Sequence, residues 1–201
     1  MQSARVLAVT LLGIGMLGYV AWVLEFFLPT GLSPIHIRVE NLYLEGQRFG
    51  PLFKYVQIVA GGALILSGLP LMRLSPLHWL ARLTAATVAL LGVTVVAGAL
   101  FPQSPWVTLL TNLVFVIGEA SLALWWPPGW RASAFIGLLL VLATWLGVLL
   151  LESLGSGQYV GLVTRLQMVL RAVLLGIGAA YLFRDRHMVS AHGRSADFAG
   201  G

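Results

Sequence analysis

Residues 79–101, WLARLTAATVALLGVTVVAGALF, decide the fold, because Arg82 is the one ionisable side chain in this apolar run. A helix that rises about 1.5 Å per residue needs about 20 mostly apolar residues to cross a hydrocarbon core of about 30 Å. The run is continuously apolar rather than alternating, which argues against a barrel strand. A helix also satisfies its backbone hydrogen bonds within the segment, as lipid requires. The stretch therefore predicts a transmembrane helix.

Similar stretches lie on both sides of this one and bring the total to six. The others run roughly over Val6–Leu28, Tyr55–Met72, Trp106–Trp126, Arg131–Leu151 and Thr164–Phe183. Short connections between the later stretches predict antiparallel neighbours. We predict an all-α polytopic membrane protein: one membrane domain over residues 1–201, built as a six-transmembrane-helix bundle. Residues 184–201 are polar and small, and we expect them to form a flexible cytoplasmic tail.

Composition supports a membrane protein and excludes several chemistries. The chain is 59% hydrophobic and only 9% charged, whereas soluble domains are about 25% charged. Its net charge of +5 comes mostly from basic residues that flank apolar segments, so we assign them to topology and expect no nucleic-acid partner. The absence of cysteine excludes disulfides and thiolate chemistry.

The distribution of Lys and Arg predicts the orientation, since these residues favour cytoplasmic loops. With the N-terminus inside, the cytoplasmic side holds Arg5, Arg73, Arg82, Arg131, Arg184, Arg186 and Arg194, and the outer side holds Arg38, Arg48, Lys54 and Arg165. We therefore expect both termini in the cytoplasm.

The longest connection, about Pro29 to Lys54, is predicted to be a structured outer loop, because connections of this length are usually functional or structured. Ser33-Pro34 is typical of a helix start and Gly46 of a helix end, which favours a short helix. The alternation over residues 35–40 favours a strand instead. The loop is either a lid or a surface for a ligand or partner, with candidate residues His36, Arg38, Glu40, Asn41 and Arg48.

Ionisable residues within predicted spans are costly and usually face the bundle interior. Glu25, Glu119 and Arg171 are such residues, and Arg171 is expected to reach one of the two glutamates. Gln167 and Arg171 share a helix face at a spacing of four, and Asn112 and Glu119 share one at a spacing of seven. These five residues form either an ion pair with polar packing or a polar pocket under the outer loop.

Enzyme signatures are weak. The sequence has no glycine-rich phosphate loop, His-x-x-x-His pair, nucleophile elbow or acidic metal cluster. We therefore expect no metal, no cofactor and no catalytic residue.

Several short motifs resemble a known family. They are Val39-Glu40-Asn41-Leu42-Tyr43 with Gly46-Gln47, then Gly50, Leu52 and Phe53, then Phe101-Pro102, and Gly161 with Arg165. Together they resemble a bacterial six-span membrane family of unknown function that is distantly similar to the Frag/DRAM/Sfk group, over about Leu11 to Phe183. Family members usually carry Ser-Glu-Leu where this chain has Glu40-Asn41-Leu42, and an acidic residue where it has Ser104. The resemblance implies the topology and a bacterial plasma membrane, and no established reaction.

These observations favour a non-enzymatic membrane protein, either an accessory or assembly subunit or a lipid-handling protein. Membrane lipids are the expected partners, with another membrane protein as the second class. The alternatives are an enzyme acting on a lipid, with Glu119 as acid or base beside Arg171 as an anion clamp, and a small transporter.

Overall fold

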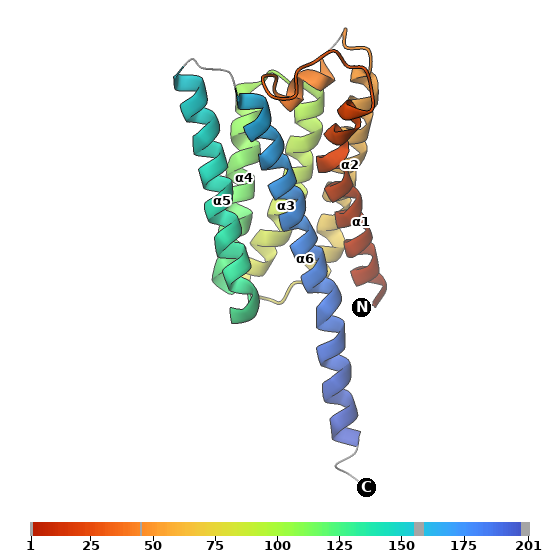
Figure 1. Ribbon diagram of the computed structural model, residues 1–201. Helices are drawn as coiled ribbons and strands as arrows, with labels where there is room; N and C mark the ends of the chain where they lie inside the picture. Colours follow the sequence, from red (N-terminus) through yellow and green to blue (C-terminus); the bar gives the residue numbers. More distant parts are fainter. Residues whose placement is uncertain (1, 45, 155–158, 198–201) are drawn as a thin grey trace.

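The computed structural model describes residues 2–44, 46–154 and 159–197, with side chains up to residue 184. These residues form six long helices and no strand, which confirms the predicted all-α architecture. The helices are α1 (Gln2–Val20), α2 (Gly50–Leu74), α3 (Trp79–Leu100), α4 (Pro105–Trp125), α5 (Pro128–Ser153) and α6 (Val160–Asp197) (Figure 1). All six are long and apolar enough to cross a membrane, if α1 is extended through the following 3₁₀ turn. The chain is therefore a multi-pass integral membrane protein.

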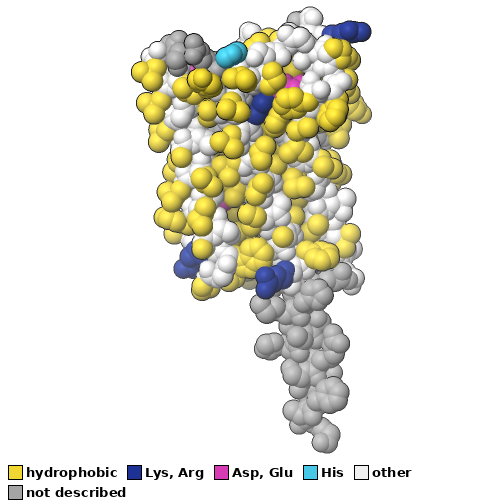
Figure 2. Space-filling view, in the orientation of Figure 1, with side chains coloured by type: hydrophobic (Ala, Val, Ile, Leu, Met, Phe, Trp, Pro, Cys, Tyr) yellow, Lys and Arg dark blue, Asp and Glu magenta, His cyan; other side chains and the backbone are white. Residues whose placement is uncertain are grey.

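The helices form a closed ring. Each packs against the next in the chain, and α6 packs back against α1 (Figure 1). Gly61 of α2 and Gly92 of α3 permit a close approach of these two helices, because a Cβ on Gly61 would lie 2.8 Å from the Gly92 carbonyl oxygen. Hydrophobic side chains cover the flank of the ring, whereas Lys and Arg gather toward its two ends (Figure 2). This pattern is the one that a bilayer requires.

Several spans have different bounds from those predicted. Between Ala21 and Phe26 the first helix tightens into a 3₁₀ helix, η1. Helix α2 begins at Gly50 instead of Tyr55, with a proline in its first turn, and α6 begins at Val160 instead of Thr164. Lys54, which the sequence places at the end of the first connection, therefore lies within α2, and Arg165 lies one turn further into its helix than predicted. Their place on the outer side of the membrane stays a prediction. Hydropathy marks only the apolar part of a helix, and both helices extend beyond it.

The connection over residues 27–49 contains one 3₁₀ helix, η2 (Val39–Tyr43). Its Val39, Leu42 and Tyr43 are buried against the bundle. The predicted helix from Ser33 to Gly46 is thus shortened, and the alternative strand does not form. Gly46 follows η2 with φ +95°, a conformation that glycine adopts without strain. The assignment of this connection to the outer side of the membrane stays a prediction.

Helix α6 continues past the predicted end of its span at Phe183 and reaches Asp197. The flexibility and cytoplasmic location predicted for residues 184–201 stay predictions, and residues 198–201 lie outside the described part of the chain.

Candidate functional site

A buried ion pair joins the first span to the last. The Arg165 Nε atom donates to Glu25 Oε1 at 2.5 Å, and Arg165 Nη2 donates to Glu25 Oε2 at 2.7 Å. Both side chains are buried. The 3₁₀ geometry of η1 aligns residues three apart, so Trp22 lies on the same side as Glu25, and its ring centroid is 5.7 Å from Arg165 Cζ. The bidentate pair therefore fixes η1 against α6.

Arg165 also holds the first connection. Its Nη1 donates to the carbonyl oxygens of Pro34 at 2.5 Å and Ile37 at 2.8 Å, and to that of Gly161 at 3.0 Å. The backbone N–H of Leu162, near the start of α6, donates to the Ile35 carbonyl at 3.2 Å. These bonds satisfy loop carbonyls that would otherwise be buried without partners. We call Glu25, Arg165 and the attached residues 34–37 the clamp.

Glycine at position 161 makes this close approach possible. A Cβ there would meet the carbonyl oxygens of Ile37 at 2.5 Å, Pro34 at 2.6 Å and Ile35 at 2.8 Å. The Gly161 and Arg165 motif thus has a direct structural role, since one residue admits the connection and the other binds it.

The clamp seats η2 over a small polar cavity of about 70 Å³, the loop-side pocket. Its polar lining comes from five of the long helices (α1, α2, α3, α4 and α6) and from η2, and includes Tyr19, Glu40, Tyr43, Gln57, Gln167 and Arg171. Of the five residues predicted for a pocket under the first connection, Gln167 and Arg171 line this cavity, whereas Glu25, Asn112 and Glu119 do not.

Arg171 is the centre of the pocket's hydrogen bonding. Its Nη2 donates to Asn112 Oδ1 at 2.5 Å, and Gln167 Nε2 donates to the same oxygen at 2.8 Å. Arg171 Cζ lies 5.6 Å from the centroid of the Phe115 ring, a cation–π contact. The structure thus brings Asn112, Gln167 and Arg171 together, as the helix-face spacing predicts.

Four polar atoms around this pocket are buried without a hydrogen-bond partner in the described part of the chain. They are Tyr19 Oη, Tyr43 Oη, Glu40 Oε2 and Arg171 Nε. Arg171 forms no ion pair with any described carboxylate, although Glu40 and Tyr19 are near enough to interact with it. Gln57 is likewise near enough to interact with the Tyr43 hydroxyl, so these groups lack a well-formed hydrogen bond rather than polar neighbours. Unsatisfied buried groups are costly and uncommon. Their convergence on one cavity therefore makes it a candidate binding site.

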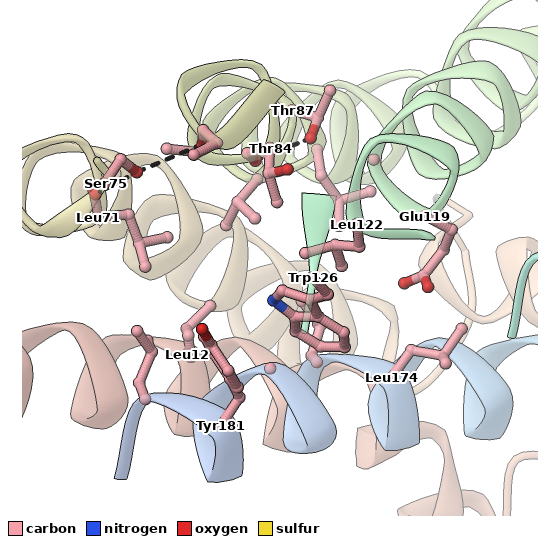
Figure 3. A pocket seen from close by; sticks show the side chains of 18 of the residues that line it. Leu12, Leu71, Ser75, Thr84, Thr87, Glu119, Leu122, Trp126, Leu174 and Tyr181 are labelled. Atoms are coloured by element: carbon pink, nitrogen blue, oxygen red, sulfur yellow. Dashed lines mark hydrogen bonds between the residues drawn. The ribbon is translucent and has the colours of Figure 1, made fainter. Parts of the chain in front are cut away.

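A second cavity, the terminal cavity, occupies the other end of the bundle, where α1 begins and α4 ends. It has a volume of about 310 Å³ and is lined mainly by apolar side chains of α1, α2, α3, α4 and α6 (Figure 3). Trp125 Nε1 donates to Thr84 Oγ1 at 3.0 Å, and Thr84 shares a 2.6 Å hydrogen bond with Ser121. These bonds satisfy polar groups near the cavity, so its surface stays largely apolar.

Glu119 points into the terminal cavity (Figure 3). It is 6% exposed and has no hydrogen-bond or ion-pair partner among the described residues. Gly137 of α5 leaves room for it, since a Cβ there would lie 3.2 Å from Glu119 Oε2. The predicted pair between Arg171 and a glutamate is wrong: Glu25 pairs with Arg165, and Glu119 lines a different cavity from Arg171.

The remaining candidates of the first connection lie apart from both cavities. Arg38 pairs with Glu152 at the end of α5, and both side chains are more than a third exposed. Arg48 is exposed above the Phe49 ring, His36 is exposed, and Asn41 is half-buried in η2. In the described ranges no three His, Asp or Glu residues are placed to hold a metal ion.

Sequence reasoning missed Arg165, Tyr19 and Tyr43. Arg165 falls near the start of the predicted span Thr164–Phe183, where an arginine is typical of a span end, so it was assigned to topology rather than to the site. The two tyrosines were indistinguishable from apolar packing residues, although a tyrosine within a predicted span carries a hydroxyl that needs a partner. The need of a buried hydroxyl for a hydrogen-bond partner was the signal that could have identified the tyrosines as site residues.

Comparisons with protein-family models, curated proteins and solved structures find no match to this chain. The resemblance to the Frag/DRAM/Sfk group stays a prediction. The fold is that of a six-span membrane protein with two cavities, a small one with several polar lining residues and a larger apolar one.

Replacing Arg165 should strongly destabilise the protein. The Arg165→Gln variant leaves Glu25 buried without its partner, which costs about 3–5 kcal/mol. The exposed Arg38–Glu152 pair offers a matched control, because Arg38→Gln should cost at most about 1 kcal/mol. Unfolding of both variants in detergent measures the difference, and equal losses would contradict the clamp.

A methyl group at position 161 should detach the first connection. We expect Gly161→Ala to lower the melting temperature and to increase proteolysis within residues 27–49. Gly147→Ala is the control, because its added Cβ would meet its nearest neighbour, Val163, at an ordinary 3.8 Å. If both variants have the same melting temperature and the same resistance to protease, the packing of the connection on Gly161 is not tight.

Proposed function

We propose that this protein is a non-enzymatic lipid-handling membrane protein that holds a hydrocarbon chain in the terminal cavity. The observation that carries the proposal is the apolar cavity of about 310 Å³ inside the helix ring. Ligand pockets usually measure about 300–1,000 Å³, and an apolar cavity of about 150 Å³ in a model protein already binds benzene. In a bilayer, acyl chains are the abundant apolar ligands.

The position of the cavity supports a lipid. Its lining extends from Phe115 and Glu119, well inside α4, to Trp126 and Tyr181 near one end of the bundle. Aromatic residues with polar edges are typical of the membrane interface. A chain could therefore lie within the ring while its polar end stays near the interface.

The separation of Glu119 from Arg171 disfavours the alternative of an enzyme acting on a lipid. That mechanism needs an acid or base and an anion clamp at one reacting centre, and these two residues line different cavities. Transport remains a weaker alternative, since the described spans have no broken helix at their centre. No observation favours an assembly subunit over lipid handling.

We further propose a bacterial plasma membrane as the location, with both termini in the cytoplasm. The basic residues on the terminal side of the bundle support this orientation, as the positive-inside rule requires.

Filling the terminal cavity should displace lipid. Gly178 lines the cavity, and a Cβ added there meets nothing within 4 Å, so Gly178→Leu projects into open space. We expect the wild type purified in mild detergent to retain a phospholipid in native mass spectrometry and Gly178→Leu to retain less. Gly62→Leu is the control, because Gly62 is equally unobstructed but lines neither cavity. Equal retention by all three proteins would refute the proposal.

The cysteine-free sequence permits a direct test of orientation. In intact bacterial cells a membrane-impermeant maleimide should label Ser33→Cys in the first connection and leave Ser75→Cys between α2 and α3 unlabelled until the cells are lysed. The opposite pattern would invert the topology.

A further inference from the structure

We propose that the loop-side pocket binds a compact oxyanion that keeps at least one hydroxyl hydrogen, such as hydrogen carbonate, dihydrogen phosphate or the phosphomonoester headgroup of a lipid. The proposal goes beyond the terminal cavity and does not depend on it. It rests on the four unpartnered polar atoms that face one buried space.

The chemistry of these atoms selects the ligand class. Tyr19 Oη, Tyr43 Oη and Arg171 Nε can each donate a hydrogen bond, and Arg171 carries a positive charge. Two hydroxyl donors beside a guanidinium N–H are complementary to the oxygens of an oxyanion. Asn112 occupies Nη2 of Arg171 and orients the guanidinium, so Nε remains available.

Glu40 explains why the proposed anion must keep a hydroxyl hydrogen. Its unpartnered Oε2 can only accept while the carboxyl is ionised, and it would repel a fully deprotonated anion. An oxyanion that retains a hydroxyl donates that hydrogen to Glu40 and accepts from the other three groups. Each of the four unpartnered atoms then has a partner.

Tyr43 stays a donor throughout the physiological range. Burial raises its pKa, and the nearby Glu40 carboxylate raises the pKa further. Its phenolic hydrogen is therefore present whenever the ligand is.

The size of the pocket fits a group of a few heavy atoms. One enclosed water needs about 10–15 Å³, whereas this pocket offers about 70 Å³. A complete phosphatidic acid molecule does not fit, but its phosphomonoester end does. The same chemistry thus comes from two sources, a free anion or a headgroup.

Removing one hydroxyl at a time tests the site without removing the charge. Tyr43→Phe and Tyr19→Phe each delete a hydroxyl that makes no well-formed hydrogen bond in the ligand-free protein, so each should lower its melting temperature only slightly. Each should weaken anion binding by about tenfold, because a hydrogen bond to a charged group is lost. Tyr55→Phe is the control, since Tyr55 is 67% exposed on α2.

Thermal unfolding at constant ionic strength is the measurement. One arm titrates inorganic phosphate or hydrogen carbonate against chloride in detergent, and the other compares nanodiscs of phosphatidylcholine with and without phosphatidic acid. Stabilisation of the wild type in the first arm identifies a free anion, and stabilisation only in the second identifies a headgroup. In either case the two Phe variants should respond about tenfold more weakly, and Tyr55→Phe should respond as the wild type does.

Two outcomes would overturn the proposal. One is that no probe stabilises the wild type; the other is that the Phe variants respond as the wild type does. The Gly178→Leu variant separates this proposal from the lipid proposal, because it fills the terminal cavity and should leave the response to phosphate or hydrogen carbonate unchanged.

Discussion

The bidentate pair between Glu25 and Arg165 is the interaction on which the rest of the loop-side end depends. Burying two charges costs several kcal/mol per ion unless geometry and further hydrogen bonds compensate. Here the guanidinium also donates hydrogen bonds to the carbonyl oxygens of Pro34 and Ile37. Part of the compensation for burying the two charges therefore comes from the same segment that must be held in place. The position of η2, and with it that of Glu40 and Tyr43, follows from this clamp. The polar pocket is therefore a consequence of an ion pair outside it.

The closed ring of six helices explains why the protein has internal sites at all. Each helix contacts its two neighbours, and side chains must fill the centre of the ring. Leu91, Phe115 and Leu174 do so at mid-height and belong to one packed core. Above and below this layer the filling is incomplete, which leaves a polar cavity on one side and a larger apolar cavity on the other.

Hydropathy and helix periodicity predicted the elements and part of the site. Six apolar runs sufficed for six spans, and the spacing of Gln167 and Arg171 placed them correctly on one face. The pairing of charges was not predictable, because it depends on where α6 begins and on the change from α to 3₁₀ geometry at Ala21. Both are local backbone features that an apolar window does not detect. Glu119 was correctly predicted to be buried, but its lack of a partner follows only from the three-dimensional position of Arg171.

Phe115 lies between the polar groups around Arg171 and the apolar terminal cavity. One face of its ring receives the Arg171 guanidinium, and the same residue lines the terminal cavity. A cation–π contact stabilises the charge without adding a polar atom to the apolar side. The packed layer at mid-height therefore lets a buried arginine lie close to an apolar cavity. On α6, Leu174 and Leu175 line the terminal cavity about one helical turn after Arg171. A hydrocarbon chain and an oxyanion could thus be bound at the same time, each in surroundings of its own polarity.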